Sequence, residues 1–154
     1  MPPVFSPLAA GCACGANRYT LTAPPVARFI CHCTICQRYT GRAYSDVTVL
    51  LKRDIGDLLL ESTDFKRWKL PPNIRRGTCS RCHQPSIEFG IADQLAFVPT
   101  DNLQHPEQLP SPSLHAFYDS RVADVADDLP KLGGFLASQV GLSRLLMKGL
   151  LGRG

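Results

Sequence analysis

The chain has 154 residues, of which 44% are hydrophobic, and this is enough for a single domain with its own core. Its 17 basic and 13 acidic residues give a net charge of +4, which favours anionic small molecules but is too small to indicate nucleic-acid binding. No run approaches the roughly 20 apolar residues of a transmembrane span. Met1 is followed by two prolines without a basic region, so no secretory signal is visible and we expect a cytoplasmic protein.

Short runs of β-branched and apolar residues, separated by turn residues, predict most of the secondary structure. After an irregular lead-in at residues 1–10, the runs that predict strands are residues 17–22, 26–30, 43–51, 58–61, 65–70, 74–78, 85–90, 95–98 and 113–118. Turns, loops or single helical turns are expected between them, at residues 37–39, 52–57, 71–73 and 105–109. Many short strands with little helix predict a mainly β fold.

The C-terminal tail differs from the rest of the chain. Residues 135–154 contain apolar side chains at helical spacing and no acidic residue, with Arg144 and Lys148 one turn apart, so they predict a helix. This helix either packs on its own domain or a sister subunit, or lies on a membrane surface or partner. The first interpretation is favoured, because Gly141 and Gly149 would each weaken a free-standing helix by about 1 kcal/mol relative to alanine.

Seven cysteines lie in three close groups, and their odd number in a cytoplasmic chain favours metal binding over disulfide bonds. The groups are Cys12 and Cys14, then Cys31, Cys33 and Cys36, and finally Cys79 and Cys82. Four thiolates around zinc make a closed structural site, whereas three leave one position open to water or substrate. An iron–sulfur cluster needs four ligands. The central group of three therefore favours an open zinc site.

Spacing permits two ways of dividing the seven sulfurs between two ions. In one, the last two cysteines of the central group join Cys79 and Cys82 in a zinc ribbon, which leaves Cys31 and the first pair unused. In the other, Cys12 and Cys14 join Cys79 and Cys82, and the central group forms the open site without breaking any local group. Spacing alone does not choose between them.

Three cysteine motifs and two later segments form a specific pattern. They are Gly11-Cys12-Ala13-Cys14-Gly15, Cys31-His32-Cys33-Thr34-Ile35-Cys36-Gln37-Arg38 with Gly41, Arg75-Arg76-Gly77-Thr78-Cys79-Ser80-Arg81-Cys82, Asp119-Ser120-Arg121 and Asp127-Asp128-Leu129-Pro130. Over about residues 10–131, this pattern resembles the glutathione-dependent formaldehyde-activating enzyme family. After the last cysteine the family usually has glycine, where this chain has His83.

The resemblance implies a zinc-binding domain at residues 1–131 and a C-terminal helical tail at residues 132–154. Its implied fold consists of several short coiled antiparallel β-sheets around zinc knuckles, as in methionine sulfoxide reductase B and a Rab-binding exchange chaperone. The resemblance also implies two zinc ions per chain. A structural ion would be held by Cys12, Cys14, Cys79 and Cys82, and a catalytic ion by Cys31, Cys33 and Cys36.

A zinc ion with three thiolates acidifies bound water less than an all-histidine site does, but it suits a soft sulfur ligand. We therefore expect a carbon–sulfur lyase, similar to S-(hydroxymethyl)glutathione synthase, that joins or splits a small thiol such as glutathione and an aldehyde such as formaldehyde. The alternative is a non-catalytic binding module in which both zinc ions are purely structural and hold the sheets together. An oxidoreductase would need a metal-free reactive cysteine, whereas the family pattern assigns all seven as ligands.

Charged residues near the central cysteines are candidates for substrate contact. Arg38 and Arg42 follow the loop, and a guanidinium matches a carboxylate in geometry, although solvated surface charge is the simpler interpretation of both. His32 is a candidate proton relay, but its place between two ligands favours a side chain that points away. The remaining histidines are expected to be structural or exposed, namely His83, His105 and His115.

Overall fold

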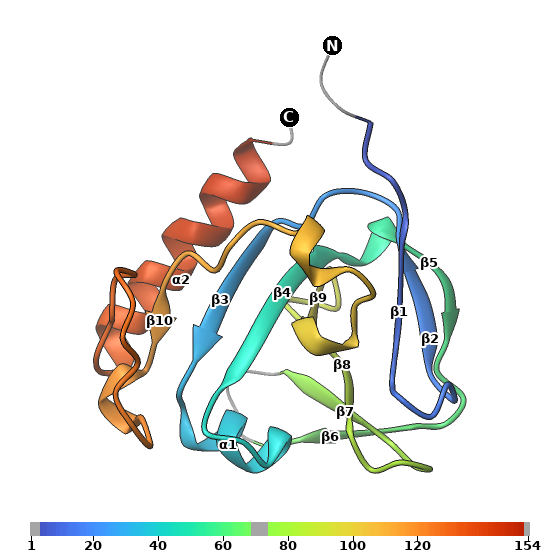
Figure 1. The fold of residues 1–154 in the computed structure, drawn as a ribbon, viewed down its shortest axis with the longest axis horizontal. Helices are drawn as coiled ribbons and strands as arrows, with labels where there is room; N and C mark the ends of the chain where they lie inside the picture. Colours follow the sequence, from blue (N-terminus) through green and yellow to red (C-terminus); the bar gives the residue numbers. More distant parts are fainter. Residues whose placement is uncertain (1–3, 69–73, 153–154) are drawn as a thin grey trace. The chain divides into compact units, whose positions relative to one another are not determined.

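The computed structural model describes residues 4–68 and 74–152 (Figure 1). Ten β-strands in these residues form two sheets, and a helix follows them near the C-terminus, so the predicted mainly β fold is confirmed. The loop predicted at residues 71–73, and the end of the strand predicted at residues 65–70, lie outside the described residues.

The described residues form two compact units. The first contains residues 4–25, 49–68 and 74–109, and the second contains residues 26–48 and 110–152. Cys12, Cys14, Cys79 and Cys82 all fall in the first unit, whereas the three central cysteines fall in the second. Each unit therefore carries its own group of thiols.

A small antiparallel sheet in the first unit has the order β1-β2-β5. Its strands are β1 (Leu8–Gly11), β2 (Arg18–Leu21) and β5 (Ile55–Leu59). Leu8 pairs with Leu21 and Ala10 pairs with Tyr19, and all four are buried because alternate side chains of a strand share a face. The predicted irregular lead-in is therefore wrong for residues 8–10, whereas residues 4–7 are irregular as predicted. Pairing with β2 holds a run of alanine and glycine extended, although these residues favour strands weakly.

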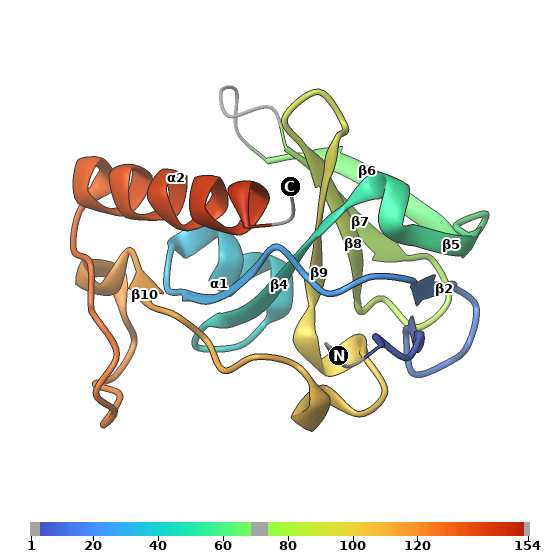
Figure 2. The same cartoon turned by 90° about the horizontal axis from the view of Figure 1, so that it is seen from above.

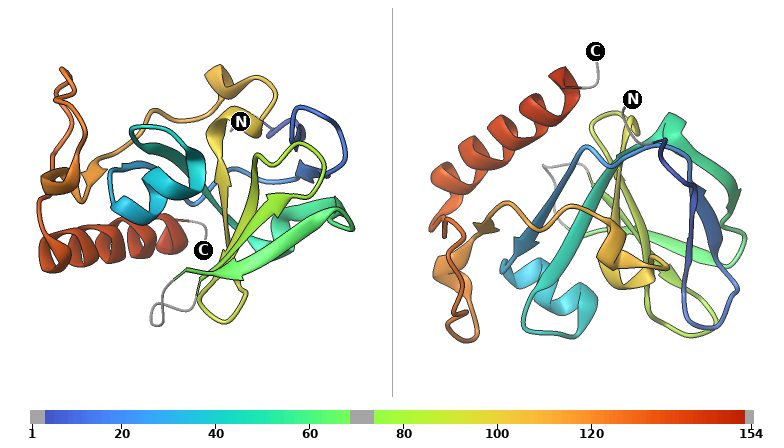
Figure 3. Two further views of the ribbon diagram at one scale, coloured as in Figure 1. Left: turned by 90° about the horizontal axis from the view of Figure 1, so that it is seen from below. Right: turned by 45° about the horizontal axis from the view of Figure 1, so that its top comes forward.

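The larger sheet contributes five strands to the first unit, in the order β4-β9-β8-β7-β6 (Figure 3). They are residues 49–51 of β4 (Ser45–Leu51), together with β6 (Thr63–Arg67), β7 (Arg75–Cys79), β8 (Pro85–Gly90) and β9 (Leu95–Pro99). Successive strands from β6 to β9 pair antiparallel. Three short 3-10 helices complete the connections, η1 (Lys52–Asp54), η2 (Thr100–Asn102) and η3 (Pro106–Gln108). The last confirms the short helix predicted at residues 105–109.

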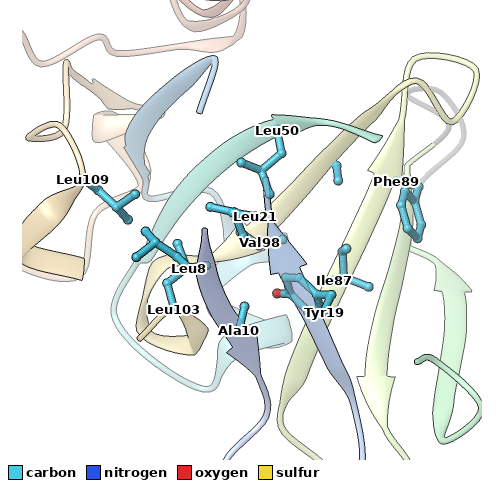
Figure 4. Packing of buried hydrophobic residues seen from close by; sticks show 11 residues of the cluster. Leu8, Ala10, Tyr19, Leu21, Leu50, Ile87, Phe89, Val98, Leu103 and Leu109 are labelled. Atoms are coloured by element: carbon cyan, nitrogen blue, oxygen red, sulfur yellow. The ribbon is translucent and has the colours of Figure 1, made fainter. Parts of the chain in front are cut away.

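The hydrophobic core of the first unit lies between these two sets of strands (Figure 4). It contains Leu8, Ala10, Tyr19, Leu21, Leu50, Ile87, Phe89, Ala96, Val98, Leu103 and Leu109. Burying each large aliphatic side chain contributes about 1.5 to 3 kcal/mol before the loss of conformational entropy. This cluster therefore anchors β1, the strand that leads into Cys12, and β8, the strand that pairs with β7.

The second unit has a smaller part of the same sheet, in the order β10-β3-β4. It consists of β10 (His115–Ala116), β3 (Ala27–Cys31) and residues 45–48 of β4. β10 runs parallel to β3, with His115 opposite Ile30 and Ala116 opposite Cys31. The strand predicted at residues 113–118 is correct only for two residues. It ends because Phe117 has a left-handed backbone conformation (φ 54°), which turns the chain into the 3-10 helix η4 (Tyr118–Ser120).

Helix α1 (Thr34–Thr40) connects β3 to β4 and is longer than the single turn predicted at residues 37–39. Gly41 ends it in the left-handed conformation (φ 67°), and the Gly41 amide donates to the Gln37 carbonyl. The helix begins early because the Cys33 side chain caps its N-terminus.

Helix α2 (Phe135–Leu151) confirms the helix predicted in the tail, whose last two residues lie outside the described ones (Figure 2). It packs against β3 and β10. A Cβ atom on Gly149 would lie 2.1 Å from the Val26 carbonyl oxygen, and one on Gly141 would lie 2.2 Å from the Leu132 side chain. Both glycines therefore allow close packing. Among the described residues, no helix is long and apolar enough to cross a membrane.

Candidate metal centres

The first thiol cluster joins two loops of the first unit. Cys12 and Cys14 follow β1, whereas Cys79 ends β7 and Cys82 comes one turn later. The four Sγ atoms all lie within 4.8 Å of one another. Cys12 Sγ is 3.4 Å from Cys14 Sγ and 3.7 Å from Cys79 Sγ, and Cys14 Sγ is 3.6 Å from Cys79 Sγ. The structure thus brings together the four cysteines that the resemblance assigned to a structural ion.

Tight backbone turns place these sulfurs. The Gly15 amide donates to the Cys12 carbonyl at 3.0 Å, and Gly15 has a positive φ of 78° that suits glycine. In the second loop, the Cys82 amide donates to Cys79 Sγ at 3.4 Å and the His83 amide donates to the Cys79 carbonyl at 2.9 Å. His83 has a φ of 61°, a left-handed conformation that glycine adopts more easily. This explains why glycine suits the position after the last cysteine.

The spacing of the four sulfurs fits a tetrahedral metal ion better than it fits disulfides. Zinc–sulfur bonds of about 2.3 Å place the sulfurs of a tetrahedral site about 3.8 Å apart, whereas a disulfide joins them at about 2.05 Å. The separations of 3.4 to 3.7 Å are close to the tetrahedral value. All seven cysteines of the chain are free.

The ionisation of the cluster also favours a bound cation. Burial opposes ionisation of Cys12, but hydrogen bonds from the Asn17 amide and neighbouring thiols outweigh it and lower the pKa of Cys12 to about 6. The Ala16 backbone favours ionisation of Cys14, yet interactions with Cys12, burial and Cys79 raise the pKa of Cys14 to about 11. Ionisation of one cysteine therefore opposes ionisation of its neighbour, and a divalent cation would remove this repulsion between thiolates.

The second thiol cluster lies in one loop of the second unit. Cys31 ends β3, Cys33 caps α1 and Cys36 lies in the first turn of α1, where its amide donates to Cys33 Sγ at 3.3 Å. The three Sγ atoms lie within 4.8 Å of one another. Cys31 and Cys36 are buried and Cys33 is half-buried. Within residues 4–68 and 74–152, no histidine, aspartate or glutamate joins this group as a fourth donor.

Neighbouring thiols oppose the ionisation of Cys31 and Cys36 when no cation is present. Cys33 is the main cause that raises the pKa of Cys31, with burial adding to it. Cys31 and then Cys33 raise the pKa of Cys36 well above its ordinary value. A divalent cation would allow all three to ionise and would still have one position without a protein ligand. The three residues therefore fit an open metal site.

A chain of three hydrogen-bonded polar side chains, two of them buried histidines, begins next to this cluster at His32. His32, between Cys31 and Cys33, is 1% exposed, and its Nε2 atom is 2.8 Å from Nδ1 of His115. His115 is also 1% exposed, and its Nε2 atom is 2.7 Å from Oδ2 of Asp127. Burial is the main factor that lowers the pKa of His32. Lys131, followed by His115, holds the pKa of the Asp127 carboxyl below its usual range.

The sequence indicated only parts of this hydrogen-bonded row of side chains. His115 was expected to be structural or exposed, and it is buried between two polar partners. Asp127 is part of the motif Asp127-Asp128-Leu129-Pro130, but the sequence alone assigned it no role. No spacing rule could join His32 to His115, because they come together only through the parallel pairing of β3 with β10.

The remaining candidates lie on the surface. Arg38 is on the exposed side of α1, and Arg42 follows the helix and is also exposed. His83 is exposed, as is His105, whose Nδ1 atom lies 3.1 Å from Oε1 of Glu107. Binding of substrate carboxylates by the two arginines stays a prediction.

Together, the mainly β fold and the two thiol clusters define a protein with two candidate metal centres, one of four cysteines and one of three. A family model described as "Glutathione-dependent formaldehyde-activating enzyme" matches residues 7–120, and the chain belongs to this family. The resemblance inferred from the motifs is thereby confirmed, although Asp127 lies beyond the matched segment. No curated protein matches the chain.

A solved structure supports the fold. The crystal structure of a Rhodobacter sphaeroides protein is similar, with a TM-score of 0.52 and 15% sequence identity. The similarity covers 68% of this chain and 96% of that chain. At this identity the likeness concerns the fold and carries no information on substrate.

Proposed function

We propose that the protein is a zinc-dependent carbon–sulfur lyase that joins or splits a small thiol, such as glutathione, and an aldehyde, such as formaldehyde. The observation that carries the proposal is the three-cysteine cluster, since the described residues provide no fourth histidine, carboxylate or thiol donor for it. The family to which the chain belongs is named for formaldehyde activation with glutathione.

The three cysteines have the role of ligands in this proposal. A zinc ion held by Cys31, Cys33 and Cys36 would supply Lewis acidity, which favours the thiolate form of a thiol bound in the open position. In the joining direction, a bond forms between the thiol sulfur and the aldehyde carbon, the carbonyl double bond becomes single, and the thiol proton ends on the new hydroxyl oxygen. Splitting reverses each change. No oxidant or reductant is required.

The other parts of the chain have supporting roles. Cys12, Cys14, Cys79 and Cys82 would hold a second, structural zinc ion, because four thiolates leave no open position. We assign the activity to residues 1–131, with residues 132–154 as a helical tail. Arg38 and Arg42 would bind the carboxylates of a glutathione-like thiol. Seven free thiols suit a reducing compartment such as the cytoplasm.

The test combines metal analysis with exchange spectroscopy. The purified protein should contain two zinc ions and should accelerate the NMR-detected exchange between free glutathione and its hydroxymethyl adduct in a formaldehyde mixture. Cys33→Ser should reduce this exchange to the uncatalysed rate. Thr34→Ser is the matched control, since Thr34 is exposed on the same loop and should leave the rate unchanged. Equal rates for the native chain and Cys33→Ser would refute the assignment.

The alternative is a binding module in which both ions are purely structural. It requires a protein side chain as the fourth ligand of the three-cysteine cluster. The described residues place no histidine, aspartate or glutamate there, which supports the enzyme over the module.

A further inference from the structure

Helix α2 packs on its own unit through one face only. This inner face lies against β3 and β10, and within it Ser138 is fully buried and Gly149 approaches the Val26 carbonyl. Both strands lie on the same side of the helix (Figure 2). The opposite, outer face of α2 is therefore not used to hold the helix on its unit.

The outer face carries four exposed apolar side chains, which we call the outer stripe. They are Leu136, Val140, Met147 and Leu151, and they are 75%, 41%, 55% and 74% exposed. At 3.6 residues per turn they lie within about 60° of one another around the helix axis, on the side opposite to Ser138 and Gly149. Single exposed apolar residues are common on protein surfaces, whereas an aligned group rimmed by polar residues marks an interaction surface.

Two cations border one edge of the outer stripe. By the same helical geometry, Arg144 lies about 20° and Lys148 about 60° from Leu151 around the axis, and both are exposed. In the described part of the chain, neither side chain forms an ion pair. Residues 135–154 contain no acidic residue, and the carboxylate of Asp119 contacts the helix at its other end, where it accepts from the Gly134 amide. The charge beside the outer stripe is therefore purely positive.

A second copy of the chain would suit the apolar side chains of the outer stripe but not these cations. In an antiparallel pair, Leu136 would face Leu151 and Val140 would face Met147. The two-fold axis would then pass beside Arg144, and the two Arg144 side chains would meet on the same side of the interface. Like charges without an acidic neighbour repel, whereas the phosphates of an anionic lipid surface attract every cation on this edge.

We propose that the outer stripe is a docking surface for an anionic phospholipid membrane. Helix α2 lies in the plane of the headgroups, its outer stripe enters the boundary of the acyl chains, and Arg144 and Lys148 extend to the lipid phosphates. The inner face keeps the second unit attached to the helix, so the whole unit is carried to the membrane surface. This binding is separate from the proposed lyase activity and needs no turnover.

The first experiment measures binding to vesicles. The zinc-loaded full chain should co-sediment with vesicles of phosphatidylcholine that contain about 30% phosphatidylserine, and should stay in solution with vesicles of phosphatidylcholine alone. Raising the salt concentration from about 0.1 M to about 1 M shortens the Debye length from about 10 Å to about 3 Å, and should weaken the binding several-fold.

Two double variants separate the apolar and the charged contributions. Leu136→Gln with Leu151→Gln replaces the two most exposed members of the outer stripe, and should lower the vesicle partition coefficient by more than about tenfold. Arg144→Gln with Lys148→Gln should lower the partition coefficient on anionic vesicles by about fivefold for each charge removed. All four side chains are exposed, so the circular dichroism spectra should match that of the native chain.

Each double variant has a matched control. Val122→Gln removes an apolar side chain that is 66% exposed in the same unit but outside α2. Lys52→Gln with Arg53→Gln removes two exposed cations from the first unit. Both controls should bind anionic vesicles as the native chain does.

The proposal would be overturned if the native chain failed to bind anionic vesicles, if it bound neutral vesicles equally well, or if Leu136→Gln with Leu151→Gln bound as the native chain does. Sedimentation velocity without vesicles should show a monomer. A dimer that dissociates in the same leucine variant would assign the outer stripe to a second copy instead of a membrane, and this too would overturn the proposal. The measurements on the native chain decide the matter even if a variant fails to fold.

Discussion

Gln37 Nε2 donates a hydrogen bond to the Ser120 carbonyl oxygen at 2.8 Å, and the same nitrogen donates to the His32 carbonyl at 2.8 Å. One side chain of α1 thus joins the three-cysteine loop to η4, far along the chain. The geometry of the candidate open site depends on this amide, although it contributes no ligand.

Replacing Gln37 with alanine should therefore destabilise the second unit. Two neutral hydrogen bonds contribute about 1 to 3 kcal/mol together, and Gln37→Ala should lower the free energy of unfolding by about this amount in urea titrations. Gln94→Ala is the control, because the Gln94 side chain makes only a 3.5 Å contact with the Ala92 carbonyl at the surface. A loss no larger than that of the control would show that Gln37 does not hold the loop.

The two thiol clusters should respond differently to the loss of one ligand. Cys82→Ser should remove one zinc ion per chain and lower the melting temperature strongly, because a four-thiolate site joins two distant loops of the first unit. Cys33→Ser should also remove one ion but lower the melting temperature less, since its three ligands lie in one local loop. Elemental analysis with thermal denaturation measures both, and a larger loss of stability in Cys33→Ser would contradict the assignment of roles.

The metal-free protein should have a stability maximum near pH 9. The pKa of Cys12 falls from 9.0 to about 6 on folding, so this group contributes stability above pH 9 that is lost as the pH falls towards 6. The pKa of Cys14 rises from 9.0 to about 11, so its contribution is complete below pH 9 and is lost as the pH rises towards 11. Urea denaturation of chelator-treated protein between pH 6 and 11 checks this, and in Cys12→Ser the rise from pH 6 to 9 should become weaker. A flat profile in the unmodified chain would argue against the coupled ionisation.

Alanine at Gly149 should destabilise the protein, contrary to its effect in an isolated helix. The added Cβ would lie 2.1 Å from the Val26 carbonyl oxygen, and such overpacking costs about 1 to 3 kcal/mol, which exceeds the gain of about 1 kcal/mol in helix propensity. At Gly152 the nearest atom to a new Cβ is 3.3 Å away, so Gly152→Ala should have little effect on thermal stability. If Gly149→Ala were stabilising, α2 would not pack closely on this unit.

The two exposed arginines should influence substrate binding more than turnover. Arg38→Ala and Arg42→Ala should raise the KM for glutathione several-fold with a small change in kcat, as expected when a contact acts equally in the ground state and transition state. With 2-mercaptoethanol, which has no carboxylate, the native chain and both variants should have the same KM. An unchanged KM for glutathione would show that neither arginine binds the substrate and that both are ordinary surface charges.

Local patterns predicted the strands and the grouping of the cysteines well. Residues 85–90 form β8 as predicted, because alternating apolar residues bounded by turns determine a strand locally. The division of the seven sulfurs into two clusters required the family resemblance, since spacing allowed a second arrangement. The structure has Cys12 with Cys79, which spacing could not require.

Features that depend on distant segments escaped the sequence analysis. β1 contains alanine and glycine and is extended because β2 pairs with it. His115 looked ordinary in sequence, but β10 places it against His32. From the sequence, the glycines of α2 were expected only to destabilise the helix. They also let the helix pack closely against Val26 and Leu132, and these two residues lie outside the helical pattern.

The parallel pairing of β10 with β3 also determines when the three-cysteine loop can reach its folded conformation during synthesis. Ribosomes release Cys31, Cys33 and Cys36 long before His115 and Ala116, so the nascent loop carries three reactive thiols while one edge of its strand is still bare. Cys12 and Cys14 are likewise synthesised well before Cys79 and Cys82, the other two members of their cluster. A growing chain therefore depends on a reducing environment, or on early capture of metal, to reach its final fold without mispaired sulfurs.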